Sequence, residues 1–432
     1  MASSKSSGLS SQPRVTSVAW GWRLEAALAL GCFALLKLSI PFGSGGPVLA
    51  SGLLVIALAS APQLRAQISK WLASARSRRV LAAALRNCQI VGLRGTPPSV
   101  MSSEEIPAGQ RFLVRLTIGM HAGTLEQHAP ELAAALGARE VRVSQHAKNA
   151  SFAHLYVIRA ETLPRQVLSS PLMAKGQTSI WQPIDIGRDE NGLPVTISLP
   201  EHNLLIGGEP GAGKSVAMAN IVAAVALDPT ATLTLLDGKT VELAQWEDCA
   251  DRFVGPDQQE ALDVLHNLQL VMDLRYEVLR STRKRKIDPT SDQGLHVVVI
   301  DELAFYLRGG DKKVRDEFAD NLRDLVSRGR AAGMIVIAAT QKPSHDIVPT
   351  WIRDLFSYRL AMRCTSPEAS DTILGQGWAS QGFSSSSIDP ANRGVGYLLA
   401  EGGLPIKFKA AYLSDDDIEE LAVRAAGVRS HW

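Results

Sequence analysis

The feature that most constrains how this 432-residue chain folds is a glycine-rich segment between two apolar stretches. Residues 203–206 before it have the character of a buried strand, and residues 216–227 after it have the pattern of a helix. The segment consists of Gly208, Glu209, Pro210, Gly211, Ala212, Gly213, Lys214 and Ser215. It matches G-x-x-x-x-G-K-[ST], in which glycines let backbone N–H groups surround phosphates at the positive end of the helix. The sequence therefore predicts a nucleotide-binding site in an α/β fold.

Two side chains of this segment are expected to contact ATP and its metal ion. Lys214 should reach the β- and γ-phosphates, and the Ser215 hydroxyl should bind Mg²⁺. ATP and Mg²⁺ are therefore the cofactors that the sequence predicts.

A second apolar run ends in two carboxylates. Residues 296–300 are rich in β-branched side chains, which is typical of a strand buried on both faces, and Asp301 and Glu302 follow directly. Ligands bind at the carboxyl ends of strands in open α/β sheets. We expect Asp301 to hold the Mg²⁺ shell and Glu302 to polarise the attacking water, an arrangement that favours ATP hydrolysis over a slow GTP switch.

A third buried strand, residues 334–339, leads to Gln341, and a polar residue at this place faces the γ-phosphate. Gln341 is therefore predicted to sense that phosphate. The helix before the strand carries Arg323, Arg328 and Arg330. A ring ATPase needs a cation that is presented across the subunit boundary. We favour Arg330 for this role over the other two arginines, and a solvated helix face is the alternative.

Two apolar runs near the N-terminus, about residues 24–40 and 47–61, predict a pair of transmembrane helices, although each is slightly shorter than the roughly 20 residues of a typical span. Basic residues flank both outer ends and the connecting loop is uncharged, so both termini are expected in the cytoplasm. A cleaved signal peptide and a buried helical hairpin are the alternatives. The basic segment 65–88 is then expected to form a helix near anionic headgroups of the inner leaflet.

A small β-α-β-β module is predicted next. Its strands are expected at 111–118, 140–144 and 154–159, with a helix that ends at Gly137 and a linker at 96–105. Its four histidines lack the spacing of metal ligands and are interpreted as ordinary surface or core residues. The four cysteines of the chain lie far apart, so we expect neither a disulfide framework nor a zinc site.

The formal net charge is only +2, so any charge that binds nucleic acid must be local. Two groups of basic residues are candidates for contacts with DNA phosphates, and a solvated turn is the alternative for the first. The first group is Arg280, Arg283, Lys284, Arg285 and Lys286, and the second is Arg308, Lys312 and Lys313.

Several of these motifs together resemble the FtsK/SpoIIIE family of DNA translocases. Residues 236–243 (LDGKTVEL) resemble its "DPK…EL" segment, and residues 272–276 (MDLRY) resemble its "MERRY" helix. Residues 329–333 (GRAAG) and 339–344 (ATQKPS) resemble its "ARAAG…ATQRPS" signature. Residues 372–374 and 413–417 resemble its later "RTIL" and "SDEE" blocks. The small domain resembles the family's α subdomain, so the resemblance runs from about residue 95 to residue 420.

The resemblance implies a hexameric ring with double-stranded DNA in the pore and ATP sites between subunits. The layout is most similar to family members from actinobacterial conjugative elements, which implies an ATP-driven DNA pump at the cell membrane and further conjugation proteins as partners. Two expected spans instead of four, and too few residues after the motor for a winged-helix domain, are departures from the chromosome-segregating members. A type VII-like protein-secretion ATPase and a single-stranded DNA coupling protein are the alternatives.

The expected fold class is α/β, with a RecA-like P-loop NTPase motor, a small N-terminal α/β domain and a two-helix transmembrane hairpin. The expected divisions are a cytoplasmic tail (1–19), the hairpin (20–64), a basic linker (65–94), the small domain (95–180), the motor (181–415) and a C-terminal tail (416–432).

Overall fold

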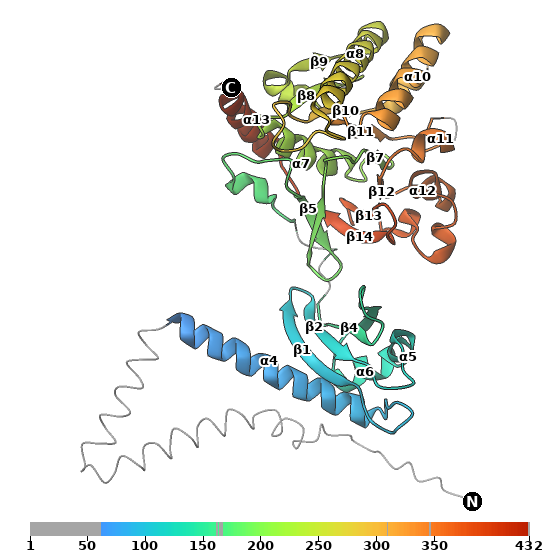
Figure 1. The fold of residues 1–432 in the computed structure, drawn as a ribbon. Coiled ribbons are helices and arrows are strands. Elements are labelled where there is room, and N and C mark those ends of the chain that lie inside the picture. Colours follow the sequence, from blue (N-terminus) through green and yellow to red (C-terminus); the bar gives the residue numbers. More distant parts are fainter. Residues whose placement is uncertain (1–61, 161–162, 164–166, 309, 345–346, 431–432) are drawn as a thin grey trace, which may run out of the picture. The chain divides into compact units, whose positions relative to one another are not determined.

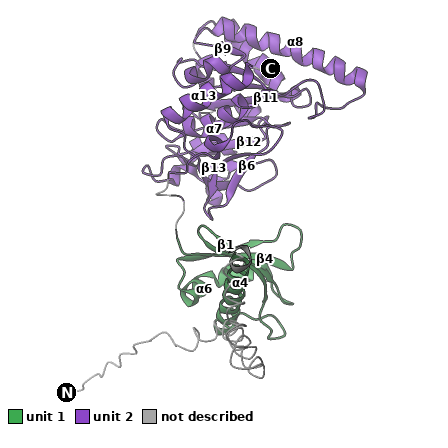
Figure 2. Ribbon diagram, turned by 90° about the vertical axis from the view of Figure 1, so that its left-hand side faces the viewer, with its two compact units in different colours: residues 1–161 green, residues 162–432 purple. Residues whose placement is uncertain are grey.

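The computed structural model describes residues 62–160, 163, 167–308, 310–344 and 347–430. The chain divides into two compact units, residues 1–161 and 162–432 (Figure 2). This division lies closer to the N-terminus than the expected boundary after residue 180. The two apolar runs predicted to span a membrane lie outside the described residues. Among the helices that are described, none combines the length and the apolar character that a membrane span requires.

The smaller unit is an antiparallel sheet of strand order β1-β2-β4-β3, with helices on one face. Its elements are α4 (Pro62–Asn87), β1 (Ser99–Ile106), β2 (Gly109–Arg115), α5 (Ala122–Gln127), α6 (Ala129–Leu136), β3 (Glu140–Gln145) and β4 (Phe152–Ile158). Alternate residues of the central strands, such as Phe112 and Leu155, are buried against Leu85 of α4 and Leu132 of α6. The helix expected at 65–88 is therefore confirmed, and its apolar side completes the core of this unit.

Two expectations for the smaller unit were wrong. Residues 96–105 are not all linker, because most of them form β1, an edge strand whose side chains are mostly exposed and therefore lack an alternating apolar pattern. The predicted single helix is two helices, with the break at His128 just before Pro130, which has no N–H to continue the hydrogen-bond ladder. The second helix ends as expected at Gly137, which has a left-handed φ of 57°.

The larger unit contains a ten-stranded sheet of order β6-β5-β14-β13-β12-β7-β11-β10-β8-β9. The strands are β5 (Ile184–Asp189), β6 (Pro194–Ile197), β7 (Leu204–Gly207), β8 (Thr232–Leu236), β9 (Arg252–Val254), β10 (His296–Ile300), β11 (Met334–Thr340), β12 (Tyr358–Met362), β13 (Val395–Leu399) and β14 (Ile406–Ala410). In this sheet β12, β7, β11, β10, β8 and β9 run parallel to one another. On the other side of β12, each of β13, β14, β5 and β6 pairs antiparallel with its neighbour. The predicted strands at 203–206, 296–300 and 334–339 are thus confirmed as neighbours in the centre of the sheet.

Helices cover both faces of this sheet (Figure 1). They are α7 (Lys214–Ala226), α8 (Gln258–Thr282), α9 (Leu303–Leu307), α10 (Lys312–Arg328), α11 (Thr350–Arg353), α12 (Pro367–Leu374) and α13 (Asp415–Arg429). Successive side chains of a strand point to opposite faces. Val297 and Val299 of β10 accordingly pack in the core that contains α7 and α13, and Val298 and Ile300 pack in the core that contains α8 and α10. This arrangement confirms the expected α/β class and places the carboxyl ends of the central strands along one edge.

Candidate nucleotide-binding and hydrolysis site

The glycine-rich segment forms a tight loop between β7 and α7, as predicted. Gly211 and Gly213 adopt φ values of +77° and +98°, which other residues rarely adopt. A Cβ atom on Gly213 would lie 2.6 Å from the backbone nitrogen of Gly394. The loop therefore requires glycine there both for its backbone conformation and for its contact with the neighbouring chain segment.

Lys214 begins α7 and forms a buried ion pair with Asp301 at the end of β10. Its Nζ atom lies 3.0 Å from Oδ1 of Asp301 and donates to the Asp301 carbonyl oxygen at 2.9 Å. Lys214 is 4% exposed and Asp301 is fully buried. The structure thus brings together the two residues that the sequence places 87 positions apart.

Asp301 has an oxygen atom that suits a metal shell. Its Oδ2 atom is buried and has no hydrogen-bond partner among the described residues, which is a costly arrangement for a carboxylate. Burial raises the pKa of Asp301, while the ammonium group of Lys214 opposes this effect. Ser215 lines the adjoining cavity. A hydroxyl and a carboxylate oxygen are the hard ligands that Mg²⁺ prefers, so the residues present fit the ion.

The side chain of Glu302, at the end of β10, is held by residues at the end of the neighbouring strand β11. Its Oε1 atom accepts a hydrogen bond from the Thr340 hydroxyl at 2.8 Å, and its Oε2 atom accepts one from the Gln341 backbone N–H at 3.1 Å. Oε1 also accepts from the N–H of Ala304 and so caps α9. Glu302 is only 7% exposed. Its carboxylate is therefore fixed at the carboxyl edge of β10 and β11, where the sequence predicts a group that polarises water.

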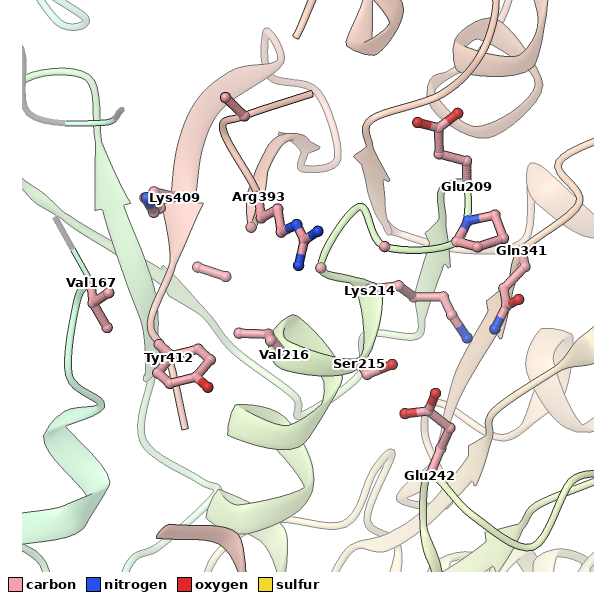
Figure 3. Close-up of a pocket in the computed structure, with 16 residues that line it drawn as sticks. Val167, Glu209, Lys214, Ser215, Val216, Glu242, Gln341, Arg393, Lys409 and Tyr412 are labelled. Atoms are coloured by element: carbon pink, nitrogen blue, oxygen red, sulfur yellow. The ribbon is translucent and has the colours of Figure 1, made fainter. Parts of the chain in front are cut away.

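A cavity of about 590 Å³ opens over the phosphate loop. Lys214, Ser215 and Gln341 line it together with Glu242, as Figure 3 shows. Four residues from the phosphate loop complete this side, namely Glu209, Pro210, Gly211 and Gly213. Asp301 and Glu302 are not part of the lining. Asp301 contacts the lining residue Lys214, and Glu302 accepts a hydrogen bond from the backbone N–H of the lining residue Gln341.

The segment after β8 is ordered by one buried carboxylate. Asp237 accepts hydrogen bonds from the backbone N–H groups of Lys239, Thr240, Val241 and Leu243, at 2.8 to 3.0 Å. This network fixes the tight turn that carries Glu242 to the cavity wall. The first part of the "DPK…EL"-like motif is therefore structural, and its glutamate faces the site.

Arg330 does not line this cavity. It lies beside a separate hollow of about 430 Å³, donates to the Leu355 carbonyl oxygen at 3.2 Å, and lies 3.8 Å from Glu401. Arg328 is held by Asp324 and Asp273, which raise its pKa.

Arg323 stacks on the ring of Trp351, with 5.2 Å between its guanidinium carbon and the ring centroid. Each of the three candidate arginines therefore has a different set of contacts.

The basic residues near the end of α8 form an exposed group. Lys284 pairs with Asp288, and Lys286 pairs with Glu201. Arg280 and Arg285 have no ion-pair or hydrogen-bonded side-chain partner in the described part of the chain. Arg283 ends the helix with a left-handed φ of 55°. In the second candidate group, Lys313 pairs loosely with Glu317 at 3.9 Å.

Several cavity residues were missed by the sequence analysis. They are Val167, Val216, Glu242, Ala391, Arg393, Gly394, Lys409, Ala410 and Tyr412. Most come from β14 and from the segment before β13, which lie outside the recognised motifs. No local pattern marks the residues of β14 and of the segment before β13, because only the antiparallel pairing of β13 and β14 beside β12 brings them to the phosphate loop.

Comparisons with known proteins agree with this geometry. Residues 176–376 match the FtsK/SpoIIIE family. The DNA translocase SpoIIIE of Bacillus subtilis is 27% identical over 340 residues, which cover 73% of this chain and 41% of that protein. The DNA translocase FtsK of Pseudomonas aeruginosa is 26% identical over 367 residues, which cover 76% of this chain and 44% of that protein. The chain thus spans less than half the length of these relatives.

Two solved structures share the fold. The pCW3 conjugation coupling protein TcpA, solved as a monomer with ATPγS, superposes with a TM-score of 0.54 at 19% identity over 82% of this chain and 99% of its own. ATPases 2 and 3 of EssC from Geobacillus thermodenitrificans give a TM-score of 0.52 at 13% identity over 63% of this chain and 53% of their own. At these identities the likeness shows a shared fold. The match to the FtsK/SpoIIIE family covers the phosphate loop, Lys214 and Asp301, so residues 176–376 of this chain are an ATPase domain of that family type.

Proposed function

We propose that this protein is an ATP-driven translocase of double-stranded DNA that acts at the cell membrane in conjugative transfer. The observation that carries the proposal is the buried pair of Lys214 and Asp301 under a phosphate loop, beside a carboxylate, Glu302, that is fixed by the next strand. The named relatives SpoIIIE and FtsK are DNA translocases, and TcpA is a conjugation coupling protein. These names support DNA as the cargo and conjugation as the setting.

The residues of the site divide the work of hydrolysis. The phosphate loop donates backbone N–H groups to the phosphates, and Lys214 neutralises charge on the β- and γ-phosphates. Glu302 orients the attacking water and accepts its proton. Gln341 shares its backbone N–H with Glu302 and places its side chain in the cavity, so a lost γ-phosphate changes contacts at the end of β11. With Ser215 and Asp301 as its ligands, Mg²⁺ would neutralise charge on the transferred phosphoryl group.

We propose that the protein forms a hexameric ring, in which the neighbouring subunit supplies a cation that stabilises charge in the transition state of hydrolysis. Arg330 lies outside its own nucleotide cavity, and its single backbone bond and 3.8 Å ion pair hold it weakly. An arginine placed so can enter the site of the next subunit and stabilise charge in the transition state. We therefore assign Arg330 as the trans-acting arginine. Arg328 is a poorer choice because two aspartates already bind it.

Duplex contact is assigned to the exposed end of α8. Arg280 and Arg285 are available for phosphates, while Lys284 and Lys286 have exposed carboxylate partners that a phosphate can replace. Exposed pairs of this kind contribute little, so their exchange costs little. Contacts with phosphates carry no base specificity, which suits a motor that passes over any sequence.

The two apolar runs before residue 62 are the segments that we propose to span the membrane, and they lie outside the described residues. The helix α4 follows them directly and carries six basic residues and no acidic one. Trp71, which is 54% exposed, and Ile68, which is 38% exposed, lie on the same helix. An exposed indole beside basic side chains suits the headgroup region of an anionic leaflet. Other conjugation proteins are the expected partners.

Displacement of a third strand from duplex DNA tests translocation itself. A linear duplex carries a fluorescent triplex-forming oligonucleotide, and a moving motor releases it only with ATP. The wild-type chain should release the oligonucleotide, Glu302→Gln should not, and Arg280→Ala with Arg285→Ala should slow release. Release of an oligonucleotide annealed to a single-stranded template, with no release from the triplex, would favour a single-stranded DNA coupling protein. Failure on every template, with normal ATP turnover, would favour a protein-secretion ATPase.

A further inference from the structure

The nucleotide cavity continues past the phosphate loop toward β14 and the segment before β13. Arg393 and Lys409 line this part, together with Val167 and Tyr412. Figure 3 shows the Arg393 side chain directed from that segment toward the phosphate loop, on the side away from Lys214. The cavity is thus bordered by cations at two separate places.

The backbone under Arg393 is held against the phosphate loop. The N–H of Gly394 donates to the Ala212 carbonyl oxygen at 3.0 Å, and the Gly394 carbonyl oxygen accepts from Ala410 at 2.8 Å. Gly394 has a left-handed φ of +78° and packs on Gly213. Arg393 is therefore attached to a segment whose position is fixed by the loop that wraps the phosphates.

The charges around this part of the cavity leave Arg393 without a counter-ion. It forms no ion pair or hydrogen bond with any described residue, and neither does the half-buried ammonium group of Lys409, whose pKa is lowered by burial. The carboxylates nearby are otherwise engaged: Glu209 pairs with Arg363, and Asp301 pairs with Lys214. Glu242 is the remaining carboxylate of the lining, and it lies near Lys214 and Ser215 (Figure 3).

We propose that Arg393 binds the α- and β-phosphates of the nucleotide from the outer side of the phosphate loop. The inference deepens the proposed function, since it assigns a positioning residue within the same ATP site. A phosphate loop directs the γ-phosphate toward its lysine and the strand carboxylates, so the opposite end of the cavity receives the α-phosphate and the nucleoside. Tyr412 and Val167 then offer ring and methyl surface to the sugar and base.

Because of its position, Arg393 should affect nucleotide affinity, whereas a transition-state arginine affects the rate of hydrolysis. Its guanidinium contacts phosphates that are not transferred, so it strengthens the bound states of ATP and ADP alike. Such uniform binding changes KM and leaves kcat almost unaltered. A hydrogen bond between charged groups supports an effect of roughly ten- to hundredfold on affinity.

Calorimetric titration with ADP and with a non-hydrolysable ATP analogue tests the proposal, in the absence of DNA. Arg393→Ala should raise both Kd values by roughly ten- to hundredfold, and Arg393→Lys should recover part of the loss. Arg252→Ala is the matched control, because it removes an exposed arginine of β9 that pairs with Glu260 of α8, and this variant should bind nucleotide like the wild type. Steady-state turnover of Arg393→Ala should show a raised KM and a kcat within about threefold of the wild type.

Either of two results would overturn the assignment. One is a Kd for ADP that Arg393→Ala leaves unchanged while its thermal melting without nucleotide matches the wild type. The other is a large fall in kcat at unchanged Kd, which would mean that Arg393 acts on the transferred phosphoryl group. Failure of the translocase proposal is a separate outcome, since these titrations do not contain DNA and the wild type can bind ADP without moving on a duplex.

Discussion

The ammonium nitrogen of Lys214 lies 3.0 Å from Oδ1 of Asp301 and joins the first turn of α7 to the end of β10. Both residues are almost fully buried, so this contact replaces solvent for each charge. A bound triphosphate competes with Asp301 for the same ammonium group. Nucleotide binding is thereby coupled to Asp301. The next residue, Glu302, is the one expected to polarise the attacking water.

Loss of Lys214 should stop nucleotide turnover and also destabilise the larger unit. In Lys214→Ala the Asp301 carboxylate remains buried without its partner, and breaking such a pair costs about 3 kcal/mol of unfolding free energy. Chemical denaturation measures the loss of stability, and phosphate release measures the loss of turnover. The double variant Lys214→Met with Asp301→Asn removes both charges and should regain most of the stability while staying inactive. Equal destabilisation of the single and double variants would argue against the pair as the cause.

Glu302→Gln should keep nucleotide binding and lose hydrolysis. The amide retains an oxygen that accepts from Thr340 and Gln341, so the geometry at the strand ends is preserved, but it cannot take a proton from water. We expect turnover to fall by at least about a hundredfold, with the Kd for a non-hydrolysable ATP analogue within about threefold of the wild type. Normal turnover in this variant would remove Glu302 from its role.

Arg330 should act on the neighbouring subunit. Arg330→Ala and Lys214→Ala are each expected to be inactive, because one lacks the transition-state cation and the other lacks the phosphate-binding lysine. A mixture of the two contains interfaces with an intact phosphate loop on one side and an intact Arg330 on the other. ATP turnover should therefore reappear in the mixture, at a fraction of the wild-type rate. An active Arg330→Ala variant, or a mixture that stays inactive, would contradict the assignment.

His296 should make the larger unit less stable in mild acid. Burial lowers the pKa of His296 to about 4 from its usual 6.5, helped by the positive charge of Arg275 and opposed by Asp251, and its ring contacts the Thr234 hydroxyl at 2.8 Å. Between these pH values the unfolded chain binds a proton that the folded chain does not bind. The stabilising contribution of neutral His296 is therefore complete above pH 6.5 and is lost as the pH falls toward 4, at up to about 1.4 kcal/mol per pH unit.

Thermal melting of the wild type and of His296→Gln across that range measures this contribution. The wild-type melting temperature should fall more steeply than that of the variant, because the variant lacks the group that titrates. Parallel slopes for the two proteins would assign the acid sensitivity to other groups, such as the carboxylates.

Local motifs explain what the sequence could predict. The phosphate loop, the strand before Asp301 and the strand before Gln341 each combine a buried run with a marker residue at its end, so their elements and their meeting at one sheet edge followed from the sequence. Arg393 and Tyr412 carry no such marker, and they reach the cavity only through long-range pairing of β13 and β14. The edge strand β1 was missed because exposed edge strands need no apolar face.

The rate of ATP turnover with and without duplex DNA tests the central claim most directly. The purified chain is assayed with no nucleic acid, with single-stranded DNA and with a duplex of the same sequence, at fixed salt because phosphate contacts weaken as salt rises. The account predicts that the duplex raises the rate at least about tenfold over the rate without nucleic acid, and that single strands do so far less. A rate that is the same with and without duplex would contradict it.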